Sequence, residues 1–150
     1  MKLNVAAKSA DHPRELETLG EAECWALLAG HQAGRVAVVV DDQPAICPVN
    51  YVIDGDSIVI RTNWPILTRA CSSMVALQID GADAGLGTGF SVMVQGMAHD
   101  ITHALDLASE HLQTVPVSPW APGAEPRLLR IVLWSVTGHH FCRDRQHFST

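Results

Sequence analysis

The residues best suited to chemistry are three consecutive polar side chains, Arg61, Thr62 and Asn63. Arginine offers a two-pronged set of donors to a phosphate, and threonine adds a hydroxyl. Asn63 is a favourable helix N-cap and is followed by Trp64-Pro65, so a short helix is predicted over residues 64–71. The unpaired N–H groups at a helix start also favour an anion. The pattern indicates an anion site, unless Arg61 pairs with a turn aspartate and Asn63 only caps the helix.

Other reactive groups do not form a recognisable site. His99 and His103 are four residues apart but span an expected strand-to-helix junction, and His139-His140 have no carboxylate or cysteine at ligand spacing, so no metal site is predicted. The sequence contains no G-x-S-x-G nucleophile motif. The only lysines are Lys2 and Lys8, near the N-terminus, which argues against Schiff-base chemistry.

Composition sets the class of protein. A chain of 150 residues with 47% hydrophobic residues and a net charge of −6 is typical of one globular domain, and it is a poor match for a nucleic-acid binder. No apolar run approaches the roughly 18 residues of a membrane span, and the N-terminus lacks the apolar core of a signal peptide. We therefore expect a cytoplasmic protein without membrane contact. The four cysteines form no CxxC pair and are expected to be reduced.

The stretch from Gly34 to Thr62 predicts three strands joined by the turns DDQP and DGD. The first strand, around Val36 to Val40, is apolar at every position and is expected to be covered on both faces. Pro48 marks either a bulge or an unpaired edge position, because proline cannot donate to a ladder. In the third strand Ile58, Ile60 and Thr62 share one face, and Val59 and Arg61 share the other.

The remaining elements are read in the same way. Residues 1–15 are expected to form an arm, and residues 16–150 one domain. Thr18 and Glu21 fit a capping box for a first helix, and residues 101–112 predict another amphipathic helix. Further strands are expected over residues 74–80, 90–99 and 127–140, with Gly96 as a bulge. Six strands without β-α-β alternation predict a mainly β fold, an antiparallel β-barrel with peripheral helices.

The order of these segments resembles the pyridoxamine 5′-phosphate oxidase-like family of flavin-binding split barrels. Six pieces carry the likeness over about residues 15–140: Gly34-Arg35, Pro48-Val49-Asn50-Tyr51, Ile60-Arg61-Thr62, Gly89-Phe90-Ser91-Val92 with Gly96, Pro119-Trp120-Ala121, and Ile131 through Thr137-Gly138. The resemblance implies a six-stranded antiparallel split barrel and a homodimer with FMN at the subunit interface. The flavin phosphate would lie at Arg61 and Thr62, and the flavin ring along Pro48 to Tyr51, with Trp120 closing the site from the partner. The implied cofactor residues are Pro48, Val49, Asn50, Tyr51, Ile60, Arg61, Thr62, Asn63, Leu67 and Trp120.

Two functions follow from this resemblance. The first is an FMN-dependent oxidoreductase that acts on a small organic substrate, with no side chain singled out as catalytic. Relatives commonly carry a phosphate-binding lysine after the Arg-Thr pair, and its position corresponds here to Leu67. The second function is therefore a binding protein on the same barrel that is not catalytic or holds another cofactor, such as a deazaflavin or haem.

Overall fold

The computed structural model describes residues 16–142, and the predicted arm at residues 1–15 lies outside them. Ten elements follow one another along these described residues: β1 (Glu17–Thr18), α1 (Glu21–Ala29), β2 (Ala33–Val40), β3 (Gln43–Asp54), β4 (Ser57–Thr62), α2 (Pro65–Arg69), β5 (Met74–Asp83), β6 (Thr88–Asp100), α3 (Leu107–Gln113) and β7 (Arg127–Cys142). Within this part of the chain, no helix has the length and apolar character needed to cross a lipid bilayer.

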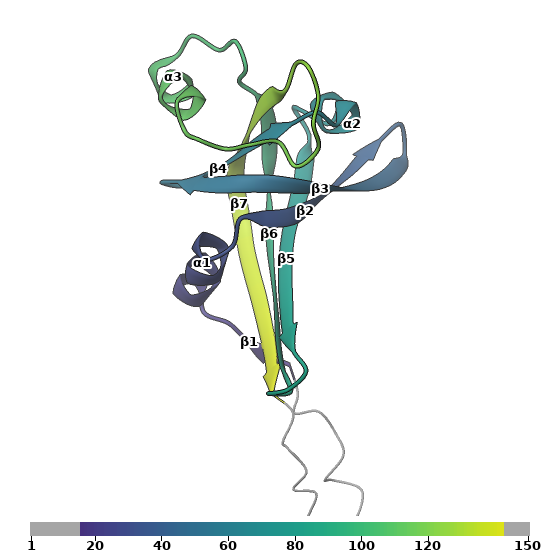
Figure 1. Ribbon diagram of the computed structural model, residues 1–150, viewed down its shortest axis with the longest axis vertical. Coiled ribbons are helices and arrows are strands. Elements are labelled where there is room, and N and C mark those ends of the chain that lie inside the picture. The colour runs from purple at the N-terminus through teal and green to yellow at the C-terminus, as the bar shows by residue number, and fades with distance from the viewer. Residues whose placement is uncertain (1–15, 143–150) are drawn as a thin grey trace, which may run out of the picture.

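Six strands close into a ring of antiparallel pairings. The sheet order is β1-β7-β4-β3-β2-β5-β6, and β6 pairs again with β7. The two-residue β1 lies outside the ring, against β7. The prediction of a six-stranded antiparallel barrel with peripheral helices is confirmed, and β1 is an addition that the sequence pattern did not indicate. Beyond the ring, β5, β6 and β7 continue together towards β1 and α1, whereas α2 and α3 lie near the other end (Figure 1).

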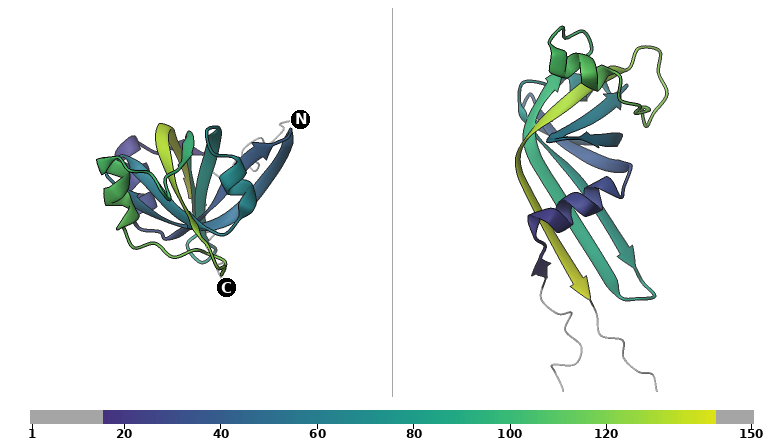
Figure 2. Two further views of the ribbon diagram at one scale, coloured as in Figure 1. Left: turned by 90° about the horizontal axis from the view of Figure 1, so that it is seen from above. Right: turned by 90° about the vertical axis from the view of Figure 1, so that its left-hand side faces the viewer.

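Two apolar clusters hold the helices on this sheet. The larger one contains inward residues of the barrel strands together with Cys24 and Leu28 of α1. The smaller one joins Val59 of β4 to Ile101 and to Leu112 of α3. Ile58 and Ile60 belong to the larger cluster and Val59 to the smaller, so the predicted division of this strand into two faces is confirmed. The two clusters place α1 and α3 at different points along the molecule (Figure 2).

Helix starts differ from the predictions. α1 begins at Glu21 with Gly20 as its N-cap, and Thr18 belongs to β1, so the predicted capping box is wrong. Thr18 pairs instead with His139 of β7, two residues before the N-cap. The later helix is also shorter than predicted: α3 begins at Leu107, after Asp106, whose side chain accepts from the backbone N–H of Ser109.

β2 is covered on one face only, contrary to expectation. Val36 and Val38 are buried, but Val39 is 61% exposed. Ile46 on the adjacent strand β3 is 69% exposed and Met74 on β5 is 47% exposed. Together with Ala37, these residues make up an apolar outer face over β2, β3 and β5, which we call the outer face.

Gly96 lies at the predicted irregularity in β6. The register between β6 and β7 shifts between Gln95 and Gly96, which confirms the bulge. A Cβ atom at position 96 would lie 2.3 Å from the carbonyl oxygen of Val132. The two longest strands therefore cross at a distance that only glycine allows.

Pro48 occupies the unpaired edge position that the sequence offered as one of two alternatives. It pairs with Arg35 of β2 on one side, and the pairing of β3 with β4 on the other side starts only at Tyr51.

Candidate functional site

Strand pairing brings two of the relevant side chains together. Thr62, the last residue of β4, is the register partner of Arg127, the first residue of β7. A surface hollow of about 360 Å³ opens between these strand ends and α2. Its lining consists of six polar residues, one tryptophan and one proline: Thr62, Asn63, Trp64, Pro65, Thr68, Arg69, Glu125 and Arg127. We call it the strand-end hollow.

The predicted helix cap is shifted by one residue. α2 runs from Pro65 to Arg69 with Trp64 as its N-cap, and Asn63 instead donates from its side-chain amide to the carbonyl oxygen of Ala121 at 2.9 Å. Thr62 Oγ1 accepts from the backbone N–H of Trp64 at 3.0 Å, although Thr62 is almost fully buried. Its hydroxyl proton remains able to donate to a ligand. Pro65 has no N–H, so this five-residue helix contributes fewer anion-binding donors than the sequence suggested.

Two arginines line the hollow, and each has a carboxylate partner. Arg127 donates from Nε and Nη2 to Asp100 Oδ2, at 2.9 and 2.6 Å. Arg69 donates from Nη2 to Asp41 Oδ2 at 2.6 Å, on an exposed surface. Burial alone would raise the pKa of Asp100, but hydrogen bonds from Thr102 and Arg127 outweigh it and hold this pKa below its ordinary value. Each arginine of the hollow is thus offset by a carboxylate partner, and Glu125 adds a further carboxylate to the lining.

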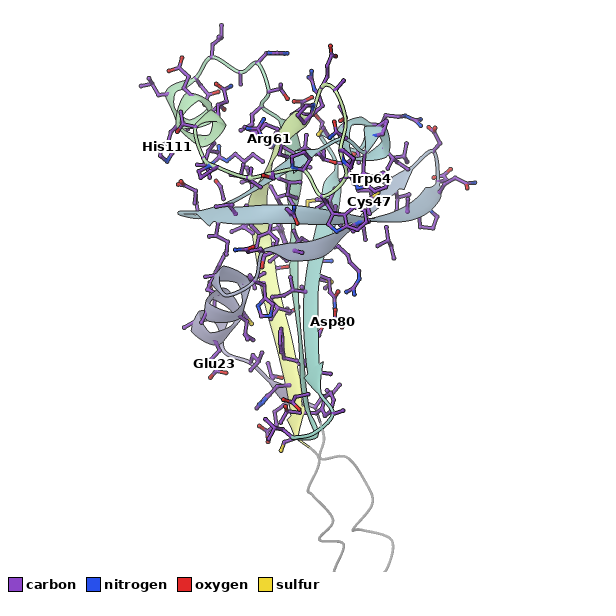
Figure 3. The ribbon with its side chains drawn as sticks, in the orientation of Figure 1. Glu23, Cys47, Arg61, Trp64, Asp80 and His111 are labelled. Carbon is purple, nitrogen blue, oxygen red and sulfur yellow. The ribbon has the colours of Figure 1, made fainter. Side chains whose placement is uncertain are left out.

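Arg61 does not line this hollow. Its side chain leaves the opposite face of β4 from Thr62, and its Nε donates to the carbonyl oxygen of Val117 at 3.0 Å. Arg61 therefore fastens the loop at residues 114–126 to the sheet (Figure 3). Thr62 and Arg69 do line the hollow.

An aromatic pair lies beside the hollow. Trp64 and Trp120 stack with their ring centroids 6.2 Å apart and their planes 26° from parallel. Trp64 Nε1 donates to the carbonyl oxygen of Pro48 at 2.9 Å, and Asn50 Nδ2 donates to that of Ser118 at 3.2 Å. The loop that carries Trp120 is thereby tied both to the outer side of β3 and to α2.

The other predicted cofactor residues point into the core. Val49, Ile60 and Leu67 are each at most 2% exposed. Tyr51 is also buried and donates its hydroxyl to the carbonyl oxygen of Leu28, and burial raises its pKa to about 12. The side chain of Leu67 is packed among barrel residues and does not face the strand-end hollow.

Sequence reasoning did not single out Trp64, Thr68 and Arg127 as site residues. Arg127 could not be assigned, because strand pairing between β4 and β7 brings it to Thr62 across a long stretch of sequence. The sequence did contain an indication for Trp64: a tryptophan between an asparagine and a helix-starting proline lies at the end of a strand. Among residues 16–142, no group of three or more histidine, cysteine or carboxylate side chains is arranged to hold a metal ion.

The closed antiparallel ring, with a polar hollow and an aromatic pair at a strand end, defines a split-barrel protein. A family model described as Pyridoxamine 5′-phosphate oxidase matches residues 20–140. The chain belongs to this family, and the prediction of the family is confirmed.

Individual relatives agree with this assignment. Uncharacterized protein Rv0080 of Mycobacterium tuberculosis is 29% identical over 143 residues, which cover 91% of this chain and 92% of that protein. The structure of the FAD binding protein from Mycobacterium smegmatis is 26% identical and superposes with a TM-score of 0.67, covering 83% of this chain and 97% of the other. A conserved protein from Corynebacterium diphtheriae is also 26% identical, with a TM-score of 0.69, and covers 84% and 98% of the two chains.

Proposed function

We propose that this protein binds FMN at the strand-end hollow and acts as a flavin-dependent oxidoreductase on a small organic substrate. The observation that carries the proposal is the hollow itself, where two arginines and two threonines lie next to a stacked tryptophan pair. Family membership and the similarity to an FAD binding protein support a flavin as the ligand. When bound, the flavin supplies hydride transfer, and the protein's part is to hold and orient it.

The donors of the hollow suit a single phosphate group. Thr62 and Thr68 offer hydroxyls, and the guanidinium groups of Arg69 and Arg127 offer charge-assisted hydrogen bonds. The flavin ring would lie along Pro48 and Asn50, within reach of the tryptophan pair. Glu125 also lines the hollow, and its carboxylate opposes additional phosphate charge, which favours FMN over the pyrophosphate-containing FAD.

The outer face supports the proposed homodimer. Val39, Ile46 and Met74 form a contiguous apolar surface on three adjacent strands, and it includes a shallow hollow of about 330 Å³. Monomeric proteins seldom leave such a surface uncovered, so we place the contact between two copies here. Pro48 belongs to the same strand as Ile46, so a partner at this face would lie beside the proposed flavin ring.

One observation favours the second candidate function, a binding protein without turnover or with another cofactor. Asp100 pairs with Arg127, Asp41 pairs with Arg69, and Glu125 adds a third carboxylate. Three carboxylates against two arginines weaken the attraction of the hollow for phosphate. A deazaflavin or haem would be the ligand to test in that case.

The deciding experiment is a visible absorption spectrum of the purified protein, followed by titration with FMN, FAD, a deazaflavin and haem. We expect flavin absorbance and FMN binding in the micromolar range. Thr62→Val, Arg69→Ala and Arg127→Ala should each weaken FMN binding. Arg61→Ala should lower flavin loading through its hold on the loop at residues 114–126. Arg35→Ala is the matched control, because Arg35 pairs with Asp80 on an exposed part of the sheet. Colourless protein that cannot be loaded with FMN, while another ligand raises its melting temperature, would favour the second function.

A further inference from the structure

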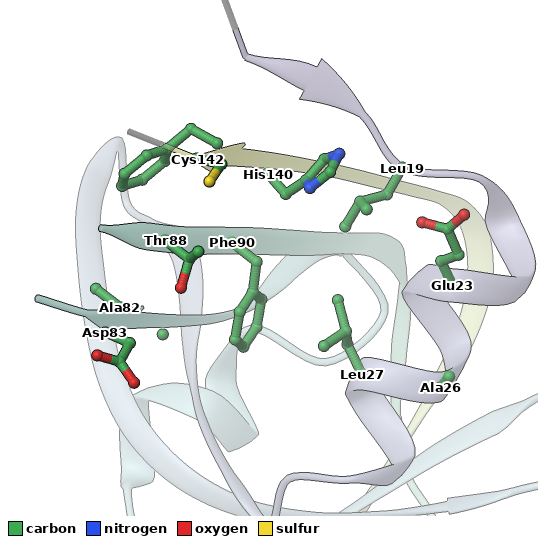
Figure 4. A pocket seen from close by; sticks show the side chains of 13 residues that line it. Leu19, Glu23, Ala26, Leu27, Ala82, Asp83, Thr88, Phe90, His140 and Cys142 are labelled. Atoms are coloured by element: carbon green, nitrogen blue, oxygen red, sulfur yellow. The ribbon is translucent and has the colours of Figure 1, made fainter. Parts of the chain in front are cut away.

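A larger cavity lies away from the strand-end hollow. It is an open pocket of about 640 Å³ between α1, the β5–β6 hairpin and the end of β7 (Figure 4). This volume falls within the range of small-molecule sites. Leu27 of α1 and Phe90 of β6 meet across its interior, and Phe141 of β7 adds a second aromatic ring. We call it the α1 cavity.

Two glycines create the floor of this cavity. A Cβ at Gly81 would lie 2.6 Å from the ring of Phe90, and a Cβ at Gly89 would lie 2.3 Å from the ring of Phe141. Both phenyl rings therefore lie flat across neighbouring strands where any other residue would push them away. The ring of Phe90 also packs against that of His31, and the two ring centroids are 5.2 Å apart. The aromatic floor is thus held in position by the sheet.

Two carboxylate side chains lie at the rim of the cavity. Glu23 extends from α1 and Asp83 from β5, on opposite sides of the opening (Figure 4). Asp83 accepts a hydrogen bond from the backbone N–H of Leu86 at 3.0 Å. Glu23 makes no hydrogen bond or ion pair within residues 16–142. His140, which also lines the cavity, lies 2.8 Å from Glu17, another carboxylate.

Among the described residues 16–142, no arginine or lysine lines the α1 cavity. A phosphate or carboxylate ligand would therefore meet negative charge without a compensating cation, which argues against a flavin or nucleotide here. An organic cation would be attracted by Glu23 and Asp83, while its apolar body would displace water from Leu27 and the two phenyl rings. Aromatic faces add to the attraction of a cation.

We infer that the α1 cavity binds a small amphipathic amine, with its protonated nitrogen at the Glu23 rim and its apolar body over Phe90 and Phe141. This site is separate from the proposed flavin site. Arg127 begins β7 in the strand-end hollow, and Phe141 lies at the other end of the same strand. The inference does not depend on whether the protein binds FMN.

Three probes of one shape test the charge preference: 1-naphthylmethylamine, 1-naphthalenemethanol and 1-naphthoate, each titrated into the full chain by calorimetry. We expect the amine to bind about three- to ten-fold more tightly than the alcohol, because exposed ion pairs contribute modestly. The carboxylate should bind most weakly. Glu23→Gln should remove most of the difference in affinity between the amine and the alcohol, with Asp83 accounting for the remainder. Equal binding of all three probes, unchanged by Glu23→Gln, would overturn the inference.

A second pair of variants tests the location. Ala26 lines the cavity, whereas Ala29 on the same helix does not, and both are exposed. Ala26→Trp should fill the cavity and abolish amine binding, and Ala29→Trp should leave it unchanged. Amine binding that survives Ala26→Trp would overturn the inference. A second result would also overturn it: the wild type does not bind the amine, and Ala26→Trp converts the dimer into a monomer. The cavity would then belong to an interface between two copies. Flavin absorbance of the same samples reports separately on the strand-end hollow.

Discussion

Trp64 and Trp120 stack at a centroid distance of 6.2 Å and join the start of α2 to the loop that precedes β7. Trp64 is held from behind by the carbonyl oxygen of Pro48, so the pair has a fixed orientation relative to β3. Trp120 is still about half exposed, at 52%. One flat side of the pair therefore remains available beside the strand-end hollow.

Replacing Trp120 tests this aromatic surface. Trp120→Ala should weaken FMN binding about three- to ten-fold, the range expected for the loss of one aromatic contact. Trp120→Phe should retain most of the affinity, since a smaller ring can still stack. The measurement is quenching of flavin fluorescence on titration with protein. Equal affinity in wild type and Trp120→Ala would place the flavin ring elsewhere.

The carboxylate of Asp100 should make the stability of the folded protein depend on pH in the acid range. Its pKa is held below the ordinary value near 3.8, so the folded state keeps the carboxylate charged at pH values where the unfolded chain binds a proton. The stabilisation is complete above the unfolded pKa and is lost as pH falls through the lower folded pKa. Between pH 6 and pH 3, the melting temperature of the wild type should therefore fall further than that of Asp100→Asn. Parallel curves for the two proteins would show that Asp100 contributes no such dependence.

The crossing at Gly96 should tolerate no side chain. Gly96→Ala places a Cβ against the carbonyl oxygen of Val132, which is backbone and cannot turn aside. We expect a loss of about 1–3 kcal/mol in the free energy of unfolding, the usual cost of overpacking. Gly20→Ser is the matched control, because nothing lies within 4 Å of a Cβ there and serine is a good N-cap. Urea denaturation of the three proteins measures both effects.

The cysteines should differ strongly in reactivity. Burial raises the pKa of the Cys24 and Cys47 thiols, and it raises the pKa of Cys71 to about 11. Cys142 is exposed. Brief treatment of the native protein with iodoacetamide at pH 8 should therefore modify Cys142 first, because the thiolate is the reactive form. Peptide mass spectrometry identifies the site, and rapid modification of Cys71 would contradict the expectation.

The outer face should control assembly. Ile46→Lys introduces a charge on that face without touching the core, since Ile46 is largely exposed. We expect the dimer to dissociate, with little change in the far-ultraviolet circular dichroism spectrum. Sedimentation velocity gives the mass, and Val52→Lys on another part of β3 is the control. An unchanged dimer in Ile46→Lys would move the interface to another surface.

The sequence predicted the fold well where the signals are local. Turn residues between Gly34 and Thr62 correctly indicated the strands, and the alternation of Ile58, Val59 and Ile60 correctly indicated the two faces of β4. The faces of β2 were not predicted, because its run of apolar residues shows no alternation. Helix starts were less well predicted. Thr18 and Asn63 both suit a cap, but one is taken by a strand edge and the other by the carbonyl oxygen of Ala121. Tertiary contacts decided between two local options of similar free energy.

The candidate site was only partly predictable, for a related reason. Thr62 and Arg69 are close in sequence and line one hollow. Arg127 reaches them through a pairing between distant strands, which no local pattern encodes. The sequence grouped Arg61 with Thr62, and the structure places these two side chains on opposite faces of β4. The alternation already noted for this strand contained that information.

β7 also has a consequence for how the chain folds during synthesis. It is the last strand of the described residues, yet it lies between β4 and β6 and pairs with both. Until β7 has left the ribosome, β4 and β6 each present an unpaired edge, and the ring cannot close. Exposed edges of this kind are prone to pair with other chains. A ribosome paused before Arg127 would therefore hold an aggregation-prone open sheet, which chaperones would have to protect until the final strand is added.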